Sequence, residues 1–161
     1  MISVLGAAGC EGAYLEIDPW IAMKVAWEPR IQGRPLYLRV SGINGGEVEM
    51  KIDPVSGALG QLVVIDAPPR VEVGNRIPLD GGDHNLTPIL DRSIWGWKEN
   101  PDGVTLDGPI ASSVEGLGFI QSEERIGLVF SDREPVRYLR CENIAVAVSD
   151  DGALVEISAF L

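Results

Sequence analysis

The sequence predicts an all-β fold, a single-domain antiparallel sandwich or barrel, and two observations carry this prediction. First, 19 glycines and 11 prolines divide the 161 residues into runs that are mostly too short for a three-turn α-helix. Second, segments such as 47–53 and 143–149 alternate large apolar residues with polar or small ones, which is the period of a half-buried strand. Many short strands separated by turn residues are typical of sandwiches and barrels.

The strands are expected where alternating or β-branched runs lie between turn residues. Val48, Met50 and Ile52 occupy one face of the segment 47–53, and charged residues occupy the other. The residues before Cys10 form a first strand, and the glycines from Gly6 to Gly12 mark a turn, because an alternating segment and not a helix follows them. The further strands are expected at 13–18, 20–27, 36–41, 47–53, 61–66, 70–73, 117–121, 126–131, 143–149 and 154–160.

An internal repeat relates two parts of the chain, 35–66 and 135–160. Tyr37-Leu38-Arg39-Val40 recurs as Tyr138-Leu139-Arg140-Cys141, and Gly57-Ala58-Leu59 recurs as Gly152-Ala153-Leu154. Each copy reads as strand, connection, strand, turn, strand. We interpret the repeat as a duplication that contributes two related three-stranded halves to one domain, 1–161, with chance similarity between short hairpins as the alternative. Neither half has enough core to be stable alone.

The stretch from about 74 to 113 lies between the two copies and is rich in Gly, Pro, Asp and Asn. Such composition is typical of surface loops, and loops on a rigid scaffold often carry binding residues. We therefore expect a loop-rich insertion here, and we expect any binding site to involve it.

Charge restricts the class of partner. The chain has 13 Lys and Arg against 24 Asp and Glu, a net charge of −11, which argues against a nucleic-acid-binding surface. No apolar stretch approaches the roughly 20 residues of a membrane span, so no membrane association is expected. Acidic residues are dense between 99 and 134, including Glu123 and Glu124. Two readings remain open: a solvated face that keeps the protein soluble, or a surface that steers a basic protein partner into contact.

Cys10 and Cys141 are the only two cysteines, and they do not form a CxxC motif. We interpret them as reduced thiols of a cytoplasmic protein. A single disulfide in a secreted protein is the alternative. No cofactor and no metal site are predicted, because the spacing matches no zinc ligand set.

The turn around the only histidine is one candidate binding site. Asp80, Asp83, His84 and Asn85 bring carboxylates, an imidazole and an amide together within six residues. These groups could hold a cation or a small ligand, but their order does not match a calcium loop. The alternative is a solvated turn whose Asp and Asn side chains bond their own backbone. No residue is assigned a catalytic role.

Trp95 and Trp97 are the second candidate. On a strand, residues at i and i+2 share a face, so the two indoles would form a platform for a partner side chain or a sugar ring. If buried, the pair would be core, as is expected of Trp20 and Trp27.

These features favour a small acidic protein-binding domain, such as an inhibitor or immunity-type partner of a basic protein. One alternative is a β domain that binds a small molecule, a metal or a carbohydrate, with weak hydrolase or isomerase-like activity. A second alternative is a self-assembling subunit that forms a homodimer. The missing catalytic motif argues weakly against an enzyme.

Overall fold

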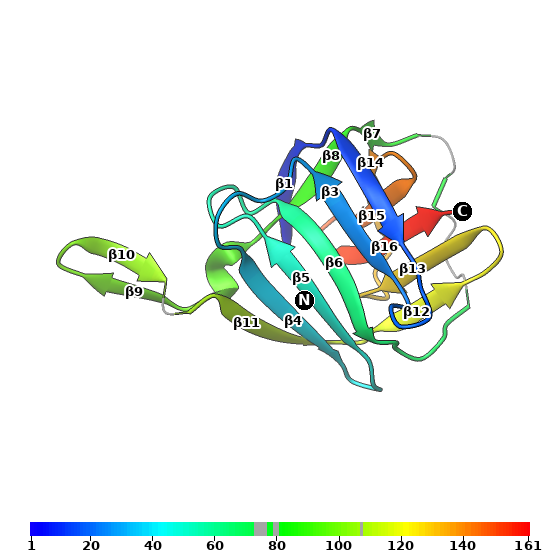
Figure 1. Cartoon of the computed structure of the whole chain (residues 1–161), viewed down its shortest axis with the longest axis horizontal. Coiled ribbons are helices and arrows are strands. Elements are labelled where there is room, and N and C mark those ends of the chain that lie inside the picture. The colour runs from blue at the N-terminus through cyan, green and yellow to red at the C-terminus, as the bar shows by residue number, and fades with distance from the viewer. Residues whose placement is uncertain (73–76, 79–80, 107) are drawn as a thin grey trace.

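Two six-stranded sheets pack against each other across an apolar core, so the chain is an all-β sandwich (Figure 1). The computed structural model describes residues 1–72, 77–78, 81–106 and 108–161, without the side chains of 98–100 and 105–106. The predicted fold class is confirmed, and a sandwich rather than a barrel forms. The described ranges hold no α-helix and no helix that is long and apolar enough to cross a membrane.

The first sheet has the order β11-β4-β5-β6-β3-β2. Its strands are β2 (Gly12–Glu16), β3 (Lys24–Glu28), β4 (Leu36–Gly42), β5 (Glu47–Ile52), β6 (Leu59–Asp66) and β11 (Ile110–Glu115). All neighbours are antiparallel except β11, which runs parallel to β4 at the sheet edge. Apolar residues such as Leu38, Met50 and Leu62 point into the core, and the opposite face is polar and solvent-accessible.

The second sheet has the order β12-β13-β16-β15-β14-β7. Its strands are β7 (Asp83–His84), β12 (Gly118–Gln121), β13 (Arg125–Val129), β14 (Pro135–Cys141), β15 (Ile144–Ser149) and β16 (Leu154–Phe160). β15 and β16 are buried on both faces, apart from Phe160 at the end of β16. Ile77 packs on the outer face of this sheet against Ala145, Ala147 and Val155.

The strand orders of the two sheets correspond. Residues 35–66 contain β4, β5 and β6, and residues 135–160 contain β14, β15 and β16, in the same relative positions. Each central triplet has a parallel strand on one side, β11 or β7. The repeated tripeptides are also bonded alike, because Leu90 N–H donates to Gly57 O (2.9 Å) and Val4 N–H to Gly152 O (2.7 Å). A duplicated unit would produce this correspondence; the duplication itself stays a prediction.

The stretch 74–113 contains more strand than its composition suggests. β8 (Leu86–Leu90) pairs with β1 (Val4–Gly9), and β9 (Trp97–Asn100) pairs with β10 (Gly103–Leu106). A short 3-10 turn, η1 (Arg92–Ile94), separates the two ribbons. Pro101 and Asp102, which were expected in a loop, form the turn of the β9–β10 hairpin. Gly103 follows them with a positive φ of 127°.

Two strand expectations differ from the structure. β3 begins at Lys24 and not at residue 20, because Asp18 caps a turn: its Oδ1 accepts the N–H groups of Trp20 and Ile21, both at 2.7 Å. Trp20 is therefore 93% exposed, so its assignment to the core is wrong, whereas Trp27 is buried as expected. In 70–72, the described part of the strand expected at 70–73, only Arg70 pairs, as an isolated bridge to Phe119.

The expectation of two reduced thiols is wrong. Cys10, which lies just before β2, forms a disulfide with Cys141 at the end of β14, and both residues are buried. Sequence spacing could not show this, because the fold brings residues that are 131 positions apart to a Cα–Cα distance of 6.4 Å. The disulfide joins the edge of one sheet to the other sheet.

Candidate functional site

The described part of the predicted turn, residues 81–85, contributes the edge strand β7 to the second sheet. Asp80 lies outside the described residues. Asp83 and His84 form β7, which pairs with Leu139 and Arg140 of β14, and the Asp83 carboxylate lies 3.3 Å from Arg137 Nε. The first acid of this turn that the structure describes therefore has an arginine partner on the neighbouring strand.

His84 and Asn85 complete this turn. Both are exposed, Asn85 adopts a left-handed φ of 60°, and its carbonyl accepts the N–H of Cys10 at 2.8 Å. The turn thus holds the disulfide segment in place. Within the part of the chain that the structure describes, no group of three or more His, Cys, Asp or Glu side chains is placed to hold a metal ion.

Glu123 and Glu124 lie at the turn between β12 and β13, where both are exposed. β12 and β7 are the two edge strands of the second sheet, so these glutamates lie about 24 Å across the sheet from Asp83, at about 4.8 Å per strand. Asp132 and Glu134 follow the opposite end of β13. Among the described residues, acids of the run 99–134 therefore lie beyond both ends of β13.

Trp95 and Trp97 do not share a face. Trp95 follows η1 and is only 1% exposed, and its indole N–H donates to Tyr37 O (3.1 Å) and Pro109 O (3.2 Å). Trp97 opens β9, is 42% exposed, and donates from its indole to Arg92 O (3.1 Å). Alternation fails here because Trp95 precedes the strand. Of the two residues, only Trp97 is available to a partner.

The ribbon of β9 and β10 is an arm that projects from the sandwich (Figure 1). Among the described strands, β9 and β10 pair with each other only. Trp95 precedes the arm in sequence and Pro109 follows it. The Pro109 carbonyl accepts both the Trp95 indole N–H and the Tyr37 N–H (2.7 Å), so these bonds hold the two ends of the arm together. Both ends of the arm are therefore bonded to Tyr37 of β4.

The buried position of Trp95 predicts that Trp95→Ala lowers the free energy of unfolding by about 3–5 kcal/mol, because a large core side chain is lost. Trp97→Ala is expected to cost about 1 kcal/mol, since it removes one hydrogen bond from a half-exposed residue. Chemical denaturation of both variants measures the difference. Equal losses would show that the two tryptophans are not placed as described.

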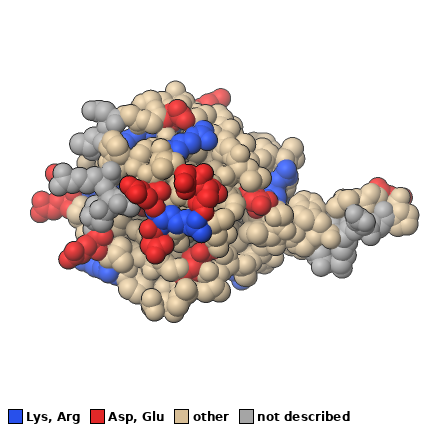
Figure 2. Space-filling model, turned by 180° about the vertical axis from the view of Figure 1, so that it is seen from behind, with Lys and Arg blue, Asp and Glu red and all other residues tan. Residues whose placement is uncertain are grey.

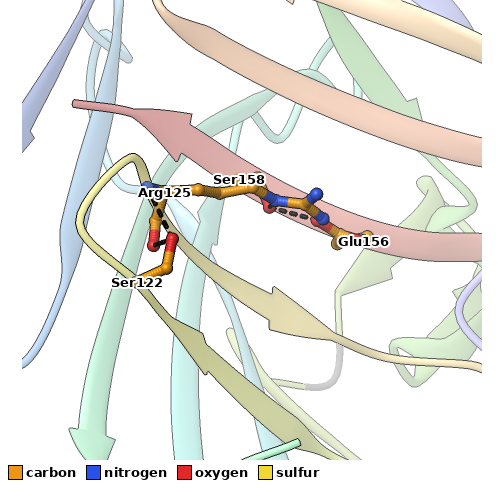
Figure 3. Close-up of polar contacts among 4 residues, drawn as sticks. All are labelled: Ser122, Arg125, Glu156 and Ser158. Carbon is orange, nitrogen blue, oxygen red and sulfur yellow. Dashed lines mark hydrogen bonds and ion pairs between the residues drawn. The ribbon is translucent and has the colours of Figure 1, made fainter. Parts of the chain in front are cut away.

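A buried ion pair lies on the second sheet (Figure 3). Arg125 of β13 contacts the carboxylate of Glu156, and its Nε donates to Ser158 Oγ at 3.1 Å. The Ser158 hydroxyl also donates to Glu156. The Arg125 N–H is bonded to Ser122 Oγ (3.1 Å), so the cluster ties the Glu123–Glu124 turn to β16. Gly127 is required beside it, since a Cβ there would lie 2.2 Å from Ser158 Oγ.

The sequence analysis missed this cluster and the arm. One signal was available for the cluster: Glu156 interrupts the apolar run Leu154–Ile157, and a charge in a strand of this kind needs a partner. The cluster joins β13 to β16 through side chains that are buried in the sheet. Comparison of the chain with models of known protein families and with curated proteins gives no match.

Proposed function

We propose that the chain is a protein-binding domain and that the β9–β10 arm is its main contact with the partner. The observation that carries the proposal is the projection of a two-stranded ribbon, β9–β10, from the body of the sandwich. An isolated two-stranded hairpin is at best marginally stable in water. The arm therefore gains stability when a partner covers it.

The described side chains of the arm suit such a contact. Trp97 is half exposed at its base and Val104 is 60% exposed on β10. Tryptophan is a frequent anchor residue at protein interfaces. Both outer edges of the ribbon also present unpaired backbone groups, which a strand of another protein can bond by β-augmentation.

The charge of the chain favours a basic partner. With a net charge of −11, the protein attracts cationic proteins and repels acidic ones. Figure 2 shows Asp and Glu side chains gathered around fewer Lys and Arg on the body of the protein, on the face seen from behind. An inhibitor or immunity-type partner of a basic protein fits this arrangement. The disulfide further favours an oxidising compartment in place of the cytoplasm that two free thiols would suit.

Shortening the arm tests the proposal. Trp97 and Leu106 are cross-strand partners, so Asn-Gly in place of residues 98–105 closes a two-residue hairpin and leaves the body intact. The tagged protein is used to capture partners from lysate at low and at moderate salt. We expect wild type to retain a basic protein that is lost at higher salt, and the shortened variant to lose it at both.

Val55→Ala is the matched control, because Val55 is 83% exposed on the β5–β6 turn of the body. It should capture the same protein as wild type. A shortened variant that still captures the partner would contradict the role of the arm. If instead wild type dimerises in sedimentation experiments and the shortened variant is monomeric, the arm binds a second copy, and the self-assembling alternative is correct.

A further inference from the structure

A groove of about 470 Å³ lies on the outer face of the first sheet. The loop 29–35 borders it, and the tyrosines Tyr14 and Tyr37 line it. Ile31 of this loop covers Gly60, where a Cβ would lie 2.5 Å from Ile31 Cδ1. Gly60 therefore lets the loop fold onto the sheet and form one wall.

The floor of the groove is a row of residues that crosses five strands. The strand register places Tyr14, Ala26, Gln61, Lys51 and Tyr37 side by side on β2, β3, β6, β5 and β4. At about 4.8 Å per strand, the two tyrosine backbones lie about 19 Å apart. The small side chain of Ala26 leaves a depression beside Tyr14, and an aromatic ring lies at each end of the row. Tyr14 is 61% exposed, and Tyr37 is half-buried.

The charges along the groove are nearly balanced. Glu16 lies 3.6 Å from Lys24, and Glu28 lies 3.5 Å from Arg30. Lys51 is different: its ammonium lies 5.8 Å from the centre of the Tyr37 ring, and no carboxylate of the described residues is within ion-pair distance of it. The groove thus contains one unbalanced positive charge. It also lies in the half of the chain, 1–80, that carries the smaller share of the negative charge.

We propose that this groove binds a short oligosaccharide that carries a single carboxylate, from one uronic-acid unit. The apolar C–H face of a pyranose packs on an aromatic ring, and Tyr14 and Tyr37 supply one at each end. The Gln61 amide and the Glu28 carboxylate supply hydrogen-bond partners for hydroxyl groups between them. Lys51 balances one carboxylate, whereas a di- or triphosphate would require several cations. The volume of the groove lies within the range of small-ligand sites.

Titration with two probes tests the proposal: a xylotriose that carries one glucuronic-acid unit, which has a single carboxylate, and xylotetraose, which is neutral. Binding is followed by two-dimensional NMR of the ¹⁵N-labelled protein. We expect the acidic probe to bind more tightly than xylotetraose and to shift the Gln61 side-chain amide. Tyr14→Ala and Tyr37→Ala should each weaken binding about tenfold, and Tyr14→Phe should keep it.

Lys51→Gln should remove the preference for the acidic probe. Arg39→Gln is the matched control, because Arg39 lies on the same sheet face outside the groove and pairs with Glu49 at 3.4 Å. No binding of either probe would overturn the proposal. Equal binding of the two probes, or equal effects of the Lys51 and Arg39 variants, would overturn the role of Lys51. The arm-shortened variant should bind the saccharide normally, so this proposal can fail or hold independently of the proposed function.

Discussion

Glu156→Ala is expected to lower the free energy of unfolding by about 3–5 kcal/mol, which is typical of a broken buried ion pair. Glu156 and Arg125 are both buried, and the Glu156 carboxylate contacts the Arg125 guanidinium and the Ser158 hydroxyl. The substitution takes away the charge that balances a buried guanidinium. Urea denaturation measures the loss as a lower midpoint at an unchanged slope.

Two further variants show whether burial is the cause. Glu49→Ala removes a carboxylate from a pair with Arg39 that is partly exposed to solvent, and it should cost about 1 kcal/mol or less. The double variant Arg125→Met with Glu156→Leu removes both charges, and it should recover most of the stability lost in Glu156→Ala. A loss in Glu156→Ala no larger than that in Glu49→Ala would show that Glu156 is not buried against Arg125.

Breaking the Cys10–Cys141 disulfide should lower the free energy of unfolding by about 3–5 kcal/mol. The bond separates its cysteines by 131 residues, so its loss frees a long loop in the unfolded chain. It also joins the edge of the first sheet to the second sheet, which raises the cost of separating them.

Thermal melts with and without reductant, and of the variant Cys10→Ala with Cys141→Ala, measure this effect. Reductant should lower the melting temperature of wild type and leave the variant unchanged. Thiol titration of the denatured, non-reduced protein should find no free thiol. Two titratable thiols per chain would contradict the disulfide. The expectation of two reduced thiols would then be correct.

Local pattern was enough to predict the fold class and most central strands. The alternation of Val48, Met50 and Ile52 placed β5 correctly, because one face of that strand is buried and the other is solvated. β11 and β7 were not predicted, since each is an edge strand whose parallel partner lies far away in sequence. No local pattern records such a pairing.

The candidate site shows the same limit. Trp20, which was expected in the core, is exposed by the turn that Asp18 caps. Trp95, for which an exposed platform and a core position were both open, is buried, and its indole donates to the carbonyls of Tyr37 and Pro109. Both outcomes depend on contacts beyond the neighbouring residues. The groove could not be predicted from local sequence either. Tyr14 and Tyr37 lie at the two ends of one row only because five strands pair in this order.

Site-specific photo-crosslinking can detect a direct contact between the β9–β10 arm and a partner protein. A benzophenone amino acid is placed at Val104 on β10, and in a separate protein at Val55 on the body. Irradiation with the partner captured by wild type, or in lysate, should give a covalent adduct from position 104 and none from position 55. An adduct from position 55 alone, or from neither position while the partner stays bound, would contradict this contact.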